Sequence, residues 1–340
     1  MGVQGPADAA REPQVSARAR VVEYYDHCWD DYRVLWRTDE TGSVHFGFFD
    51  AAASRVRPLR VLGQAVIALA AVAAAGVSAL LGGRSAAVPW LRVAARGRAL
   101  RHELAQRRMT AECADSVALR AGDLVLDAGC GVGGTDLWLA QAYGVRVLGV
   151  NVQRMHIREA LRNAANHPAA EQVRFSMQDF TELALASNAV DVVWGLESVC
   201  HCADKAAFVR EAHRVLRPGG RLMVADFFLE RDELSPRDAA AMRVWTDGWA
   251  LPNLASVEGF GAMLAAQGFT GIVNRDIRSA VLPSSWRLYK ASLLARPIHW
   301  LLEATGLRSG VAGANVQAAF HQYVTLRSGV WSYRVWVARK

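Results

Sequence analysis

From about residue 111 onward, short apolar runs alternate with segments of helical periodicity. Five runs predict buried strands, at Leu124–Asp127, Val145–Val150, Val173–Met177, Val190–Trp194 and Arg221–Asp226. The segments between them predict helices, at Thr135–Tyr143 with Thr135 as N-cap, Met155–Asn166 and Lys205–Leu216. Strands that alternate with helices are typical of a parallel sheet that carries helices on both faces.

The chain after residue 227 follows a different order. Helices are predicted at Pro236–Trp249 and Val257–Gln267, and two strand-like runs follow at Gly271–Ile277 and Trp331–Ala338. A late antiparallel hairpin that closes the sheet fits both runs. We therefore expect an α/β protein with a mostly parallel, seven-stranded sheet.

Charge, cysteine content and the N-terminal segment limit the binding partners and the cellular compartments that the protein can have. The net charge is +7, but it comes from scattered arginines without a dense basic run, which argues against nucleic acid. The five cysteines form no C-x-x-C pair and no disulfide framework, which favours a reducing, cytoplasmic compartment. Residues 1–20 are polar, lack the apolar core of a signal peptide, and are expected to form a disordered tail.

A glycine-rich turn follows the first predicted strand and precedes the first predicted helix. Gly129, Gly131, Gly133 and Gly134 follow Asp127 and Ala128. Glycines let the backbone approach a ligand closely, and the start of a helix offers free N–H groups. The spacing also satisfies the dinucleotide fingerprint, so the turn alone leaves a nicotinamide cofactor open.

Three features in fixed order decide between these cofactors: the stretch Val125–Gly133, Asp179 after the third strand, and the turn Arg217–Gly220 before the fifth. Together they resemble class I SAM-dependent methyltransferases. The resemblance implies a Rossmann-like class I methyltransferase fold with S-adenosylmethionine (SAM) as cofactor. The cofactor-binding residues that it implies are Asp127, Gly129, Cys130, Gly131, Gly133, Asn151, Val152, Gln153, Gln178, Asp179, Phe180 and Glu197. Asn151 departs from the family, which usually has an acidic residue there for the ribose hydroxyls; an amide can bond a hydroxyl without charge.

The substrate side has its own motifs. Glu197–Lys205 follows the fourth strand, Tyr24–Asp26 and His45–Gly47 lie near the N-terminus, and Trp249–Pro252 lies in the late region. These resemble the sterol C-methyltransferase, tocopherol methyltransferase and isoprenyl diphosphate C-methyltransferase group. The resemblance implies a helical lid over residues 21–60. The residues that it implies are Glu197, His201 and Tyr25 for catalysis, and Tyr24, His45 and Trp249 for substrate contact.

Purely structural roles for these residues stay open. Glu197 can merely contact SAM or cap a helix, His201 can be a packed core residue, and some of the N-terminal aromatic residues can form an ordinary buried face. Cys200, His201 and Cys202 are adjacent along the chain and have no evident fourth partner, so we expect no metal site.

Three functions remain in order of preference. The first is C-methylation of a lipophilic, isoprenoid- or sterol-like acceptor, with Glu197 or His201 as base or cation stabiliser. The second is O- or N-methylation of a hydrophobic secondary metabolite, because the same scaffold serves both chemistries. The third is a membrane-associated SAM-binding protein without catalysis.

Residues 61–83 contain no charged side chain and are long enough to span a bilayer. A single span would place residues 21–60 across the membrane from the SAM domain, which the implied lid disfavours. A hairpin or an interfacial helix keeps both flanks on one side, and plain burial or self-association into a homo-oligomer is the remaining alternative. The mixture of Trp, Tyr, Arg, Lys and Leu over residues 286–302 is also typical of a membrane interface, and it fits a hydrophobic lid over the substrate pocket equally well. We expect peripheral contact with the inner face of the membrane.

The predicted organisation has four parts. They are a tail at residues 1–20, the helical lid at 21–60, an apolar insertion and basic helix at 61–110, and the SAM-binding domain at 111–340 with a substrate-side helical insertion at about 230–310.

Overall fold

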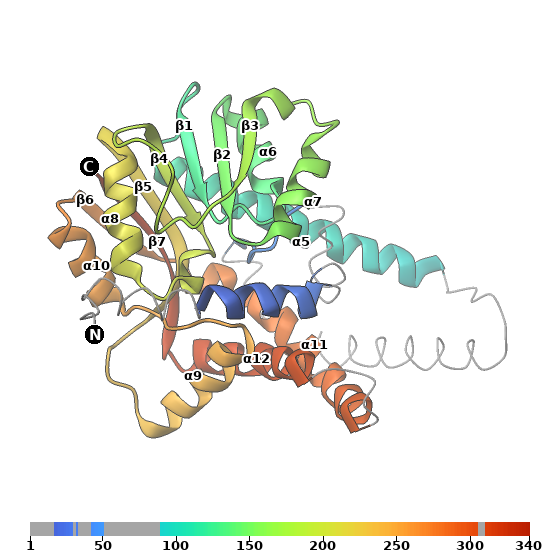
Figure 1. Ribbon diagram of the computed structural model, residues 1–340. Helices are drawn as coiled ribbons and strands as arrows, with labels where there is room; N and C mark the ends of the chain where they lie inside the picture. The colour runs from blue at the N-terminus through green and yellow to red at the C-terminus, as the bar shows by residue number, and fades with distance from the viewer. Residues whose placement is uncertain (1–16, 30–31, 33–41, 51–88, 305–309) are drawn as a thin grey trace, which may run out of the picture.

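The computed structural model describes residues 17–29, 32, 42–50, 89–304 and 310–340. A single sheet runs through it in the order β3-β2-β1-β4-β5-β7-β6 (Figure 1). The strands are β1 (Leu124–Ala128), β2 (Arg146–Asn151), β3 (Val173–Met177), β4 (Val190–Leu196), β5 (Leu216–Leu229), β6 (Thr270–Asp276) and β7 (Trp331–Arg339). The strand order reverses between β1 and β4, which is where α/β sheets place their ligands.

Pairing confirms the predicted mixed sheet. The first five strands are parallel, whereas β7 is antiparallel to both β5 and β6. The predicted turn Arg217–Gly220 lies within β5 as an irregularity, because the register steps from Val190–Leu216 to Val192–Arg221. The late pair is not a tight hairpin, since two long helices separate β6 from β7 along the chain.

Helices cover both faces of the sheet (Figure 1). The helices from residue 89 onward are α5 (Pro89–Ser116), α6 (Gly134–Tyr143), α7 (Arg154–Ala164), α8 (Lys205–Val215), α9 (Pro236–Gly248), α10 (Val257–Ala266), α11 (Arg278–Ala304) and α12 (Gly310–Arg327). Neighbouring strand residues point to opposite faces, so Val125 joins the cluster under α5 and α6, and Leu126 joins the cluster under α8 and α10. The start of α6 corrects one prediction: its N-cap is Gly133, without a side-chain hydrogen bond, and Thr135 lies inside the helix.

A group of helices lies beyond the carboxyl ends of the strands. The helix over residues 17–29 lies between the sheet and the pair α9 and α12, with α11 beside them (Figure 1). The Tyr24 hydroxyl donates to the Asn315 side chain at 3.0 Å, which joins this helix to α12. Trp245 of α9 and Trp331 of β7 pack with ring centroids 4.6 Å apart.

The apolar block at residues 61–83 lies outside the described residues, so its predicted membrane contact stays a prediction. Among the helices that the structure describes, none is long and apolar enough to cross a membrane.

Candidate functional site

The glycine-rich loop lies at the carboxyl end of β1 and has backbone angles that other residues rarely adopt. Gly129, Gly131 and Gly133 have φ values of 115°, 52° and 80°. A Cβ atom on Gly129 would lie 2.3 Å from the Ser198 Cβ, and one on Gly133 would lie 2.6 Å from the Phe175 ring. The sequence therefore needs glycine here both for the left-handed turn and for close packing.

An N-terminal segment closes the outer side of this loop. The Gly134 N–H, the first of α6, donates to the Gly42 carbonyl at 3.0 Å. The two backbones are so close that a Cβ on Gly42 would lie 2.8 Å from the Gly134 Cα. Residues 42–50 and the cofactor loop are thus one packed unit, although about ninety residues separate them in the sequence.

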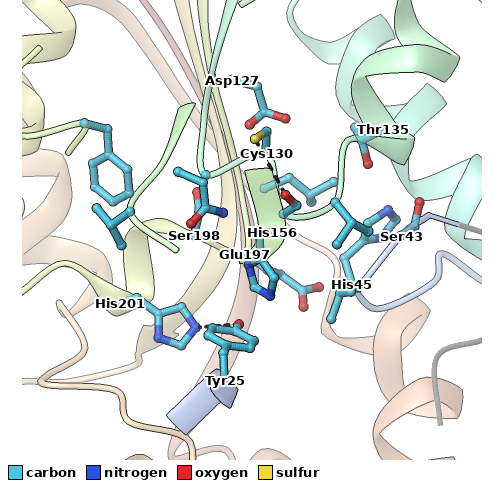
Figure 2. Close-up of a pocket in the computed structure, with 18 of the residues that line it drawn as sticks. Tyr25, Ser43, His45, Asp127, Cys130, Thr135, His156, Glu197, Ser198 and His201 are labelled. Atoms are coloured by element: carbon cyan, nitrogen blue, oxygen red, sulfur yellow. Dashed lines mark hydrogen bonds between the residues drawn. The ribbon is translucent and has the colours of Figure 1, made fainter. Parts of the chain in front are cut away.

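A pocket opens between this loop and the helix over residues 17–29 (Figure 2). Eight of the twelve predicted cofactor residues line it: Asp127, Gly129, Cys130, Gly131, Asn151, Val152, Phe180 and Glu197. Of the other predicted residues, Tyr25, His45 and His201 line the same pocket. The sequence motifs from β1, β2, β4 and the N-terminus therefore meet at one place.

Other predicted cofactor residues have structural partners nearby. Gln153 caps α7 and donates to the Val22 carbonyl and the Asp26 carboxylate, at 3.1 and 3.0 Å. The Asp179 carboxylate accepts the backbone N–H of Thr181 at 2.9 Å. These two residues, like Gly133 and Gln178, are not among the residues that line the pocket.

Asn151 lines the pocket, and its side-chain oxygen accepts the Gln153 N–H at 2.9 Å. Its amide N–H groups remain the donors available to a ribose hydroxyl. Asp127 lies in β1, just before the glycine-rich loop. Burial together with the neighbouring Asp136 raises the pKa of the Asp127 carboxyl. A cationic group bound beside Asp127 would favour its ionised form.

Glu197 projects into the pocket directly after β4 (Figure 2). Its Oε1 accepts the Phe46 N–H at 2.7 Å and the Tyr333 hydroxyl at 2.8 Å. Its φ of 50° lies in the left-handed region, so the backbone turns sharply to aim the side chain. Burial raises the pKa of the Glu197 carboxyl to about 8, although both hydrogen bonds lower it.

His201 and Tyr25 form a second polar pair, with 3.4 Å between Nε2 and the hydroxyl oxygen. Burial lowers the pKa of His201 to about 4, so its imidazole is neutral at physiological pH. Burial raises the pKa of Tyr25 well above its usual value, so the phenol is neutral too. The pair offers a proton acceptor and an aromatic face without adding net charge to the pocket.

Comparison with known proteins places this site in a family. A sequence family described as a methyltransferase domain matches residues 126–224. An O-methyltransferase of Aspergillus sclerotiorum, resE, is 31% identical over 191 residues, which is 56% of this chain and 71% of that protein. The chain belongs to the class I SAM-dependent methyltransferases.

Two further comparisons show how far the likeness extends. A 2-methyl-6-phytyl-1,4-hydroquinone methyltransferase of Synechocystis is 36% identical over 165 residues, which is 48% of this chain and only half (50%) of that relative's length. The fold is similar to that of a geranyl diphosphate C-methyltransferase from Streptomyces coelicolor, with a TM-score of 0.63 and 19% identity over 95% of this chain and 97% of that one. This second likeness concerns the fold alone.

The pocket of this methyltransferase suits SAM. The Ser198 hydroxyl and His156 Nε2 are buried there without a hydrogen-bond partner among the described residues. The acidic Asp127 suits the ammonium of the methionine end, and the ring of Phe180 offers an apolar wall for a base. The described lining residues include no Lys or Arg, which suits a cationic cofactor.

The predicted substrate residues of the methyltransferase take different positions. His45 lines the pocket, and its Nδ1–H donates to the Phe46 carbonyl at 2.9 Å, which leaves Nε2 as an acceptor. Tyr24 instead bonds Tyr32 and Asn315, each at 3.0 Å. Trp249 packs on Phe227 and Trp245 and is not among the residues that line the pocket.

Sequence reasoning missed four contributors to the site of the methyltransferase: Ser198, His156, the Phe46 N–H and Tyr333. Ser198 follows Glu197 directly, so its place was within reach of the motif. Tyr333 is fully buried and 136 positions from its partner Glu197. The backbone N–H of Phe46 carries no side-chain signal that a sequence pattern could show.

Proposed function

We propose that this methyltransferase transfers a methyl group to carbon of a lipophilic, isoprenoid-like acceptor. The observation that carries the proposal is the Glu197 carboxyl, half-buried directly after β4 and held at one oxygen by Phe46 and Tyr333. A carboxylate that is desolvated and fixed in position is costly to maintain, and such groups concentrate at functional sites.

SAM, when bound, supplies an electrophilic methyl group on a sulfonium. Methylation of an alkene leaves positive charge on the acceptor, and a proton must then leave. In its ionised form Glu197 can stabilise that charge and take the proton. The Tyr25 ring, beside His201 and His156, adds an aromatic face that favours a cation.

The surroundings of Glu197 favour an uncharged reacting end of the acceptor. His45, His156 and His201 all have pKa values lowered to about 4 by burial, so none carries a charge at neutral pH. The described lining contains no cation that could pair with a phosphate or carboxylate. Two similar proteins are named for substrates with isoprenoid chains, the 2-methyl-6-phytyl-1,4-hydroquinone methyltransferase and the geranyl diphosphate C-methyltransferase, which supports an isoprenoid acceptor.

The alternative is O- or N-methylation of a hydrophobic metabolite. It is favoured by the Tyr25–His201 pair, in which a neutral imidazole can take a proton from a hydroxyl or ammonium group. The relative from Aspergillus is named an O-methyltransferase. The third possibility, SAM binding without catalysis, is disfavoured because Asp127, the loop glycines and Glu197 all lie at one pocket.

One incubation tests whether the protein is catalytic and whether its acceptor is lipophilic. The protein is mixed with a cellular lipid extract and SAM that carries a deuterated methyl group, and the products are analysed by mass spectrometry. We expect deuterium in apolar lipids. Label only in water-soluble products would contradict a lipophilic acceptor, and no labelled product under any condition would favour the non-catalytic alternative.

We also propose that the paired helices α11 and α12 contact a membrane surface. Trp286 stacks on Tyr289 with centroids 5.1 Å apart, and Tyr323 of α12 lies 4.7 Å from Tyr289. Lys290 lies 5.7 Å from the Trp286 ring, and Arg296 lies over Phe320 at 5.1 Å. Half-buried aromatic rings beside cations suit the headgroup region of an anionic bilayer. The side chains of residues 297–302, which completed the predicted interface, lie outside the described residues.

A further inference from the structure

Two segments that are far apart in the sequence each donate a hydrogen bond to the same oxygen of Glu197. Phe46 comes from the N-terminal segment, Tyr333 from the last strand, and Glu197 from the end of β4. The Phe46 and Tyr333 side chains are 1% and 0% exposed, so water cannot replace either donor. Their rings stack with centroids 6.2 Å apart, which fixes the two donors relative to each other.

Counting hydrogen bonds shows what this convergence does to the carboxyl. A carboxyl oxygen accepts along two lone-pair directions, and both directions on Oε1 are taken, by a backbone N–H and a phenol O–H. A proton that neutralises Glu197 must therefore reside on Oε2. The hydroxyl of Tyr333 has a second acceptor, the Ala225 carbonyl, but at the longer distance of 3.4 Å.

We propose that Tyr333 is a positioning residue, which together with the Phe46 N–H reserves Oε1 and so makes Oε2 the atom at which Glu197 gains and loses its proton. The proposal rests on the function proposed above for Glu197. A carboxyl that is free to rotate would present either oxygen, protonated or not, to an acceptor. The fixed carboxyl presents one oxygen in one direction, which suits removal of a proton from one carbon of an acceptor.

Other groups that face Glu197 also bear on the pKa of its carboxyl. Asp226 of β5 is a like charge and raises the pKa of Glu197. Tyr25 from the N-terminal helix, Cys113 of α5 and Cys200 also interact with Glu197, and burial raises the pKa of each of them, so they are neutral near pH 7. His45 and His201, which line the same pocket, are neutral as well. Tyr333 and the Phe46 N–H are therefore the groups that lower the pKa of this carboxyl.

The sign of the expected effect follows from the donor role of Tyr333. A hydroxyl that donates to a carboxylate stabilises the ionised form, so its removal raises the pKa of Glu197 above about 8. A charge-assisted hydrogen bond of ordinary strength corresponds to a shift of about one pH unit. The variant Tyr333→Phe removes this hydroxyl while it keeps the ring that packs on Phe46 and Phe227.

The decisive measurement is the infrared band of the neutral Glu197 carboxyl, which is monitored as a function of pH by difference spectroscopy on the full chain. The band is assigned by its loss in Glu197→Gln. We expect its midpoint to move up by about one pH unit in Tyr333→Phe. Site-specific replacement of Tyr333 by 3-fluorotyrosine, a stronger donor, should move the midpoint down, and it covers the case in which the Phe variant does not fold. The control is Tyr143→Phe, which removes a hydroxyl bonded to Asp115 on α5.

An unchanged midpoint in both Tyr333 variants would overturn the proposal. Because the measurement needs neither SAM nor acceptor, a failure to find a lipophilic product leaves it intact and counts only against the proposed function. Where an acceptor is available, the low-pH limb of kcat should move in the same direction as the infrared midpoint while the Kd for SAM stays constant. A fall in kcat at every pH without movement of the limb would mean that Tyr333 is merely structural.

Discussion

The proposed function divides the pocket into a cofactor end and an acceptor end, and the two differ in construction. The cofactor end is a backbone structure, in which three glycines with positive φ turn tightly between β1 and α6. The acceptor end is a side-chain structure, in which Glu197 receives donors from segments 151 and 136 positions away. A local turn can serve any acceptor unchanged, whereas the assembled end can vary with each substrate.

The largest effect is expected at the acceptor end. Glu197→Gln keeps the size of the side chain but removes its ability to ionise and to take a proton, so kcat should fall by about two to three orders of magnitude for C-methylation. The Kd for SAM, measured by calorimetry, should change only a few-fold. A small loss of kcat would separate Glu197 from the chemistry and favour transfer to oxygen or nitrogen.

At the cofactor end the reverse pattern is expected. Gly129→Ala places a methyl group against Ser198 at a φ of 115°, so SAM should bind about a hundredfold more weakly. Gly219→Ala is a matched control, because Gly219 has a φ of 77° but no atom within 4 Å of its Cβ position. Equal affinities in both variants would show that the close approach of the loop is unimportant.

A variant of Tyr25 tests whether this residue acts through its aromatic ring or through the hydroxyl that contacts His201. Tyr25→Phe keeps the aromatic face and removes the hydroxyl 3.4 Å from His201. If the ring acts mainly through its face, the loss in kcat for a carbon acceptor should stay below about tenfold. A much larger loss in single-turnover rate would assign the hydroxyl and His201 to proton transfer and support the second function.

The smallest effect on catalysis is expected outside the pocket. Lys290→Gln combined with Arg296→Gln should weaken binding to anionic phospholipid vesicles by about thirtyfold in a flotation assay, since two cations near such a surface at about 1 kcal/mol each contribute about 2 kcal/mol together. Arg162→Gln with Arg210→Gln removes the same charge from exposed positions on α7 and α8. Identical losses in both double variants would point to net charge rather than to the α11–α12 face.

The same contrast explains what the sequence could predict. The predicted strand at Val173–Met177 matches β3 residue for residue, and the other core strands differ by a few positions, because a short apolar run is a local signal. The glycine loop was visible for the same reason. Tyr333 was not, since its pairing with Glu197 depends on how β7 inserts between β5 and β6.

One polar residue that was predicted to bind the cofactor has a structural role. Gln153 was predicted to bind the cofactor, and in the structure its side chain caps α7 and reaches Val22 and Asp26 of the N-terminal helix. Polar residues near a strand end can bind a ligand or tie neighbouring elements together. The chain pattern alone does not distinguish these uses.

The most direct test of the account is the position of the transferred methyl group. The product of incubation with deuterated methyl-SAM and the labelled lipid acceptor can be purified and examined by NMR. The account predicts the new methyl group on a carbon atom of the acceptor. A methyl group found on oxygen or nitrogen would contradict it and would transfer the central role from Glu197 to the Tyr25–His201 pair.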